Sequence, residues 1–157
     1  MFAVYAAEPN PDAPLDALVV GERPDPDVPD GSVAVHVEAA SLNMHDLWTL
    51  RGIGIRQEQF PMILGCDGAG RLDDGTEVVI YPVIGDPTIA GDETLDPKRS
   101  LLTERLQGTF ADVVVVPKRN VVVASAAAWM AINGAQCVAM WSPISSTSKP
   151  RSSTLRA

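Results

Sequence analysis

Strict alternation at residues 32–42, SVAVHVEAASL, constrains the fold of this chain more than any other sequence feature. Apolar residues occupy every second position from Val33 to Ala39, whereas His36 and Glu38 fall between them. A period of two places the two sets on opposite faces of an extended strand, one toward a core and one toward solvent. We therefore predict a half-buried strand here, with His36 on its solvent side.

Shorter stretches of the same kind recur along the first 120 residues and predict a mainly β fold. The predicted strands are MFAVYAA (1–7), LDALVVGE (15–22), GAGRL (68–72), EVVIYPV (77–83) and GTFADVVVVP (108–117). The turn DDGT joins the third and fourth of these into a hairpin. Short strands separated by Gly and Pro favour a partly open β-barrel with short helices. The chain has no long alternation of strands with helices and no GxGxxG, so we expect no Rossmann domain.

The stretch SLNMHDL, at residues 41–47, brings Asn43, His45 and Asp46 together directly after the long predicted strand. Asn43 or Asp46 is suited to cap a short helix that runs through LWTLRG and ends at Gly52. Short polar side chains satisfy the free N–H groups at a helix start, and glycine commonly ends a helix. Later in the chain, residues 85–108 form a long polar excursion, and connections of that size are usually functional or mobile.

Composition excludes several classes of protein. A chain of 157 residues suffices for one domain with a core, and a net charge of −8 argues against a nucleic-acid interface. No apolar run approaches the roughly 20 residues of a membrane span, and the N-terminus lacks a signal-peptide pattern. Two cysteines are too few for a disulfide framework. We expect a cytoplasmic protein that acts on a small molecule, with no nucleic-acid or membrane partner.

Taken in order, VAVHVEAA, SLNMHDLWTLRG, FPMILGCDGAG, the hairpin and GTFADVVVVP resemble the N-terminal catalytic domain of the medium-chain dehydrogenase/reductase superfamily. The resemblance covers about residues 1–120 and implies a GroES-like β-barrel. That superfamily contains zinc alcohol dehydrogenases and zinc-free quinone oxidoreductases. The resemblance implies an NAD- or NADP-dependent oxidoreductase that transfers a hydride to or from a carbonyl, an alcohol or an enone.

The resemblance also implies where a catalytic zinc would be held. In zinc-dependent members a cysteine ligand takes the position of Asn43 and a histidine ligand that of Cys66, while a Thr or Ser at the position of His45 relays the substrate proton. Cys66, Asp67 and His45 remain here as weak candidate ligands. A catalytic zinc usually has three protein ligands, and in this chain Asn43 replaces the cysteine among them. The lobe that holds a structural zinc is replaced by the polar excursion. We therefore expect no zinc.

The SLN pattern instead resembles the zinc-free branch of the superfamily. There Asn43 would face the nicotinamide and the substrate, and His45 would supply a proton or a hydrogen bond, since histidine titrates near neutral pH. The candidate catalytic residues are Asn43, His45 and Asp46. The candidate substrate-side residues are Trp48, Cys66 and Asp67.

Each candidate also has a structural interpretation, which the sequence leaves open. Asn43 is suited to capping the helix, and Asp46 to its positive N-terminal end. His45 fits a solvent-facing position in the first turn. Cys66 fits a small buried apolar residue. Trp48 fits the core, together with Leu47 and Leu50.

The composition changes abruptly near residue 121. Acidic residues are confined to the part between Glu8 and Asp112, and the text that follows is Ala-rich and apolar, then Ser/Thr-rich and basic. We assign residues 1–120 to the GroES-like domain and residues 121–157 to an atypical tail, disordered in its last part. Complete superfamily members continue into a Rossmann domain. The sequence therefore predicts a truncated member, inactive alone, whose tail comes from a frameshift or an alternative ending.

Two other functions are compatible with the predicted fold but make no use of the candidate site residues. A non-enzymatic GroES-like binding or assembly module would form a seven-fold ring, whereas the oxidoreductase would be a monomer or a homodimer. A remnant domain that has lost its function is the other alternative.

Overall fold

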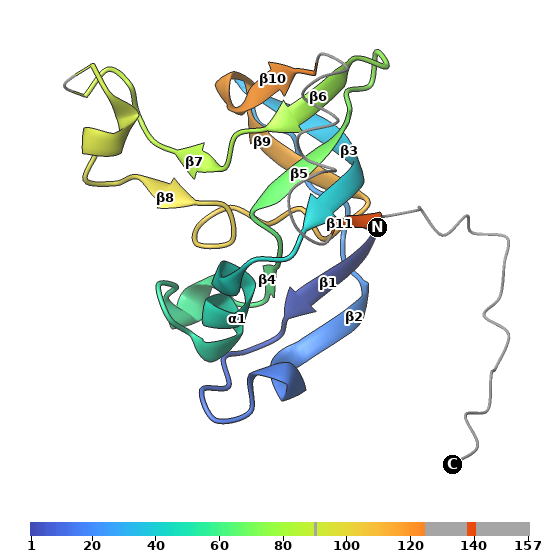
Figure 1. The fold of residues 1–157 in the computed structure, drawn as a ribbon, viewed down its shortest axis with the longest axis vertical. Coiled ribbons are helices and arrows are strands. Elements are labelled where there is room, and N and C mark those ends of the chain that lie inside the picture. Colours follow the sequence, from blue (N-terminus) through green and yellow to red (C-terminus); the bar gives the residue numbers. More distant parts are fainter. Residues whose placement is uncertain (90, 125–137, 141–157) are drawn as a thin grey trace, which may run out of the picture.

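The computed structural model describes residues 1–89, 91–124 and 138–140 (Figure 1). Its strands are β1 (Phe2–Ala6), β2 (Leu18–Glu22), β3 (Ser32–Ser41), β4 (Met62–Ile63), β5 (Asp67–Arg71), β6 (Glu77–Ile80), β7 (Val83–Ile84), β8 (Ser100–Leu101), β9 (Val113–Pro117), β10 (Val121–Val123) and β11 (Val138–Met140). The α-helix of the described residues is α1 (Met44–Arg51). Short 3-10 helices occupy Pro14–Ala17, Gln57–Gln59, Glu93–Leu95 and Lys118–Asn120.

Strand β3 is the axis of the larger sheet, because β9 pairs with its first half and β5 and β11 with its second half. The alternation predicted from the sequence is confirmed: Val35, Val37 and Ala39 are at most 3% exposed. His36 lies on the solvent side, where its Nε2 is 2.8 Å from Asp73 Oδ1. The period of two thus fixes which face of this strand meets the core.

The larger sheet has the order β10-β6-β5-β3-β11, with β9 also paired to β3, and it curls into a partly open barrel (Figure 1). A second sheet, β2-β1-β4, lies below it, and the pair β7–β8 stands out to one side with α1 beneath it. Every strand pairing among the described residues is antiparallel, unlike the parallel sheet of a Rossmann domain. The expected mainly β barrel is therefore confirmed.

The core lies between the two sheets. Its fully buried side chains come from strands that are distant in sequence, among them Ala3, Val35, Ile63, Val78 and Val114. The predicted hairpin is also observed, with Arg71 opposite Glu77 across the turn. Within the described residues, no helix is long and apolar enough to cross a membrane. Most of the predicted tail, residues 125–137 and 141–157, lies outside the described residues.

Strand β5 approaches β3 so closely that one position requires glycine. The register between them shifts from Val37–Gly70 to Ala39–Ala69, which is a β-bulge in β3. A Cβ atom placed on Gly70 would overlap the backbone carbonyl of His36. Glycine at such a site permits the close approach of two backbones.

We expect Gly70→Ala to lower the free energy of unfolding by about 2 kcal/mol or more, because the added methyl must push the two strands apart. Urea unfolding followed by circular dichroism measures the change. Gly21→Ala in β2 is the matched control, since a Cβ there meets nothing within 4 Å. Equal stability of the two variants would contradict this account of the β3–β5 contact.

Candidate functional site

The candidate site is built around the start of α1. Asn43 takes the N-cap position with an extended backbone, and the helix ends at Gly52, whose φ of 77° is in the left-handed region. Both predicted helix boundaries are therefore confirmed. Because α1 directly follows β3, its first turn places Asn43, His45 and Asp46 at the end of the central strand.

Asp46 joins the helix start to the loop before β5. Its Oδ2 accepts the backbone N–H of Asn43 at 2.7 Å, and its Oδ1 accepts the backbone N–H of Gly65 at 2.8 Å. The residue is only 5% exposed, and burial raises the pKa of its carboxyl above the ordinary value of 3.8, against the opposing effect of the two hydrogen bonds. Its observed contacts are thus structural, as one of the two interpretations of the sequence proposed.

Gly65 allows this contact between the start of α1 and the loop before β5. Its φ of 93° lies in the left-handed region, and a Cβ atom there would overlap the side chains of Thr109 and Phe110. Only glycine adopts this conformation without strain. The loop that ends in Cys66 and Asp67 is therefore held against α1 through Gly65 and Asp46.

Asn43 and Asp67 form the exposed part of the site. The Asn43 amide nitrogen donates to Asp67 Oδ2 at 2.7 Å, and the Ser41 hydroxyl donates to the same oxygen at 3.1 Å. Asn43 is exposed and Asp67 half-buried. The Asp67 carboxylate therefore orients the Asn43 side chain at the molecular surface.

His45, in the first turn of α1, is buried. It is 9% exposed, so the interpretation as a solvent-facing residue of the first helical turn is wrong. Its Nε2 has no hydrogen-bond partner among the described residues and lies 3.9 Å from Glu104 Oε1. The ring meets the edge of Trp48 at a centroid distance of 6.2 Å. A buried ring nitrogen without a partner is costly and calls for an explanation.

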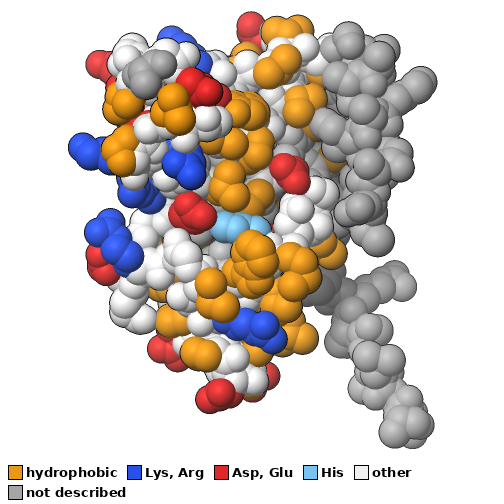
Figure 2. Space-filling model, turned by 60° about the vertical axis from the view of Figure 1, so that its left-hand side comes forward, with side chains coloured by type: hydrophobic (Ala, Val, Ile, Leu, Met, Phe, Trp, Pro, Cys, Tyr) orange, Lys and Arg blue, Asp and Glu red, His pale blue; other side chains and the backbone are white. Residues whose placement is uncertain are grey.

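Trp48 is not a core residue, although the sequence left that interpretation open. Its side chain is 45% exposed, whereas Leu50, two positions on, is 4% exposed. Figure 2 shows hydrophobic side chains gathered on one face of the molecule, with a histidine and acidic side chains among them. Leu42 and Met44, close to Trp48 in sequence, are also exposed apolar side chains, at 61% and 62%.

Cys66 is buried, as expected of a small apolar residue. Its Sγ donates to the carbonyl oxygen of Leu102 at 3.4 Å and lies 3.7 Å from the Thr103 hydroxyl. Burial raises the pKa of the thiol to about 12. In the absence of a metal ion, Cys66 is therefore a protonated thiol at neutral pH.

The remaining donor set does not fit zinc either. Asn43, which the resemblance places at the position of the cysteine ligand, donates a hydrogen bond to Asp67. Within the part of the chain that the structure describes, no three His, Cys, Asp or Glu side chains converge on a point where they could hold a metal ion. A catalytic zinc needs about three such ligands.

The sequence did not predict that Thr103 and Glu104 lie next to the site, because both are in the long polar excursion, which carries no recognisable motif. Glu104 faces His45, and Thr103 lies between Cys66 and the Thr49 hydroxyl, 3.4 Å away. Thr103 has a φ of 70°, which is strained for a β-branched residue. The excursion thus lies over α1 and brings the Glu104 carboxylate to 3.9 Å from His45 Nε2, beyond hydrogen-bond distance.

Residues 29–126 match the family model of the alcohol dehydrogenase GroES-like domain. No curated protein matches the chain in sequence. Among solved structures, an NAD-dependent alcohol dehydrogenase is similar at 31% identity and a TM-score of 0.69, over 78% of this chain and 39% of its own.

Two further solved structures share the fold at lower identity. A cobalt- and zinc-bound thermostable alcohol dehydrogenase from Pyrobaculum aerophilum matches at 23% identity and a TM-score of 0.70, over 80% of this chain and 41% of its own. An alcohol dehydrogenase from Escherichia coli CFT073, complexed with NADH, matches at 23% and 0.67, over 81% and 39%. The chain thus spans about two-fifths of the length of these proteins.

We expect Asp46→Asn to lower the free energy of unfolding at pH 7 by about 1–3 kcal/mol, because an amide offers one acceptor oxygen to two buried N–H groups. The folded-state pKa of Asp46 is raised, so the folded protein binds this proton first as pH falls. The contribution of this proton to stability is therefore complete below the ordinary value of 3.8 and is lost as pH rises through the raised folded-state pKa.

The cost of Asp46→Asn should accordingly grow as the pH is lowered from 7 toward the ordinary value of 3.8, as denaturant unfolding at each pH would measure. Asp73→Asn, at the exposed partner of His36, is the control and should leave stability unchanged at pH 7. A cost that shrinks at lower pH would contradict a raised pKa for Asp46.

Proposed function

The chain belongs to the alcohol dehydrogenase GroES-like domain family, and from this premise we propose that it forms the substrate side of an NAD- or NADP-dependent oxidoreductase. The proposed reaction is hydride transfer to or from a carbonyl, an alcohol or an enone. The observation that carries the proposal is the buried Nε2 of His45, which has no hydrogen-bond partner among the described residues and lies 3.9 Å from Glu104 Oε1.

The roles of the site residues follow from their surroundings. When bound, the nicotinamide cofactor supplies or accepts the hydride. Asn43, oriented by Asp67, hydrogen-bonds the oxygen of the substrate, on which negative charge develops. His45 donates or accepts the proton at that oxygen, and Glu104 orients its ring. Asp46 positions both residues through the start of α1.

We further propose that the site works without zinc. The support is the donor set: no three His, Cys, Asp or Glu side chains of the described residues converge on one point, and Asn43, which the resemblance places at the position of the cysteine ligand, donates to Asp67. The exposed apolar side chains of Leu42, Met44 and Trp48 then form the wall along which the substrate and the nicotinamide would lie.

The chain alone is proposed to be inactive, since it spans about two-fifths of the length of its structural relatives. A cleft between two domains would lose one wall and most of its cofactor contacts. A non-enzymatic binding module is the alternative, but such a module has no use for a buried ring nitrogen without a partner. No specific observation favours it. The expected monomer or homodimer stays a prediction.

We expect a chimaera to restore hydride transfer. Residues 1–124 would be followed by the part of the NAD-dependent alcohol dehydrogenase that lies beyond the matched region. NADH and NADPH oxidation is measured with a panel of aldehydes, ketones and enones. The chimaera should turn over at least one of them, while the 157-residue chain alone should not.

Variants of the chimaera identify the residues that act. Asn43→Ala and His45→Ala should each lower kcat by about a hundredfold or more, because each removes a group that acts on the substrate oxygen. His36→Ala is the matched control, since His36 is exposed on the strand face away from the core. A folded, NADH-binding chimaera without activity, or full activity in His45→Ala, would contradict the proposal.

A further inference from the structure

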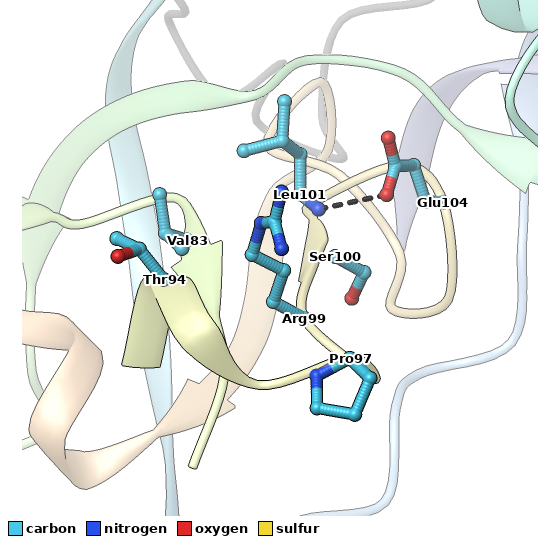
Figure 3. A pocket seen from close by; sticks show the side chains of 7 residues that line it. All are labelled: Val83, Thr94, Pro97, Arg99, Ser100, Leu101 and Glu104. Carbon is cyan, nitrogen blue, oxygen red and sulfur yellow. Dashed lines mark hydrogen bonds between the residues drawn. The ribbon is translucent and has the colours of Figure 1, made fainter. Parts of the chain in front are cut away.

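Glu104 lies between the buried ring of His45 and a pocket that opens to solvent. The pocket, of about 530 Å³, is formed between the β7–β8 pair and the loop that carries Glu104 (Figure 3). The Glu104 side chain lines this pocket and is 25% exposed, whereas the side chain of His45 is 11% exposed. A carboxylate at this boundary is therefore near both the buried ring and water.

The two oxygens of the Glu104 carboxylate have different surroundings. Oε2 accepts the backbone N–H of Leu101 at 2.9 Å, which fixes the direction of the carboxylate (Figure 3). Oε1 lies 3.9 Å from His45 Nε2, so a shift of about 1 Å brings these two atoms to hydrogen-bond distance. Nε2 has no hydrogen-bond partner among the described residues. Glu104 is therefore placed to accept a proton from this nitrogen.

The other ionisable side chains of the site are engaged elsewhere. The two carboxylate oxygens of Asp46 accept the backbone N–H groups of Asn43 and Gly65, at 2.7 and 2.8 Å. The Cys66 thiol donates to a backbone carbonyl oxygen, and burial raises the pKa of this thiol to about 12. Neither side chain is thus available to take a proton from His45.

We infer that Glu104 relays the proton between His45 and the water of this pocket during the proposed reaction. When an alcohol is oxidised, its hydroxyl proton passes to Nδ1 of His45, the Nε2 proton passes to Glu104 Oε1, and Glu104 releases that proton to water. The hydride goes separately to the nicotinamide, so the alcohol loses one hydride and one proton and becomes the carbonyl. Reduction uses the same groups in reverse. An imidazole suits such a relay, because one nitrogen accepts a proton while the other donates one.

This role goes beyond the orientation of the His45 ring by Glu104, and its place in catalysis rests on the proposed oxidoreductase function. The position of the His45 proton does not depend on that function, because it is a property of the folded chain. The relay requires that His45 carry its proton on Nε2, the nitrogen that faces Glu104, in the absence of substrate and cofactor.

NMR of the 157-residue chain with isotope-labelled histidine tests this requirement at a pH at which the ring is neutral. The nitrogen shifts give the tautomer, and saturation transfer from water gives the exchange rate of the Nε2–H proton. We expect the proton on Nε2 in the unchanged chain. In Glu104→Gln the amide oxygen keeps the Leu101 N–H, so the amide NH2 faces the ring, Nε2 becomes an acceptor and the proton moves to Nδ1.

A second variant keeps the carboxylate and changes only its reach. Glu104→Asp is shorter by one methylene, and it should slow exchange of the Nε2–H proton with water by about tenfold or more, because the acceptor withdraws from the ring. Asp73→Asn, at the carboxylate beside the exposed His36, is the matched control and should leave the tautomer and the exchange rate of His45 unchanged.

Three results would overturn the inference. They are a proton on Nδ1 in the unchanged chain, a proton retained on Nε2 in Glu104→Gln, and unchanged exchange in Glu104→Asp. The chimaera can still require His45 for turnover in each of these cases. Conversely, the expected NMR results can be obtained with an inactive chimaera, so the two proposals fail separately.

Discussion

The carboxylate of Asp46 is the interaction on which the site depends. It accepts one N–H from the start of α1 and one from Gly65, two segments that lie 22 positions apart in sequence. Without these two hydrogen bonds, the helix start and the loop before β5 would have no fixed position relative to each other. Asn43 and Asp67 could then not face each other at 2.7 Å, because each is carried by one of the two segments.

The Asp46 carboxylate, which connects α1 to the loop before β5, is a buried polar group, and the neighbouring His45 lacks a hydrogen-bond partner among the described residues. Asp46 is satisfied by backbone donors, yet burial still raises its pKa. His45, the preceding residue, is buried, and its Nε2 has no hydrogen-bond partner among the described residues. Such groups are expensive in a core and are found where a ligand completes them.

Sequence periodicity and turn-forming residues were sufficient to predict the central strand, the hairpin and the boundaries of α1. The alternation in β3, the hairpin turn and the caps of α1 are local signals, and all of them predicted the observed elements. Burial was harder to predict, because it depends on segments that meet in space: the excursion buries His45 and leaves Trp48 exposed. Glu104 and Thr103 carry no local signal at all. They lie in a loop whose path cannot be predicted from sequence periodicity.

The central claim is that hydrogen bonds, and not a metal, organise this site. Native mass spectrometry of the chain, purified from cells grown with added zinc, tests it most directly. The account predicts the mass of the 16.7 kDa polypeptide without zinc, in the unchanged chain and in Cys66→Ser alike. One zinc ion per chain that is lost in Cys66→Ser would contradict it.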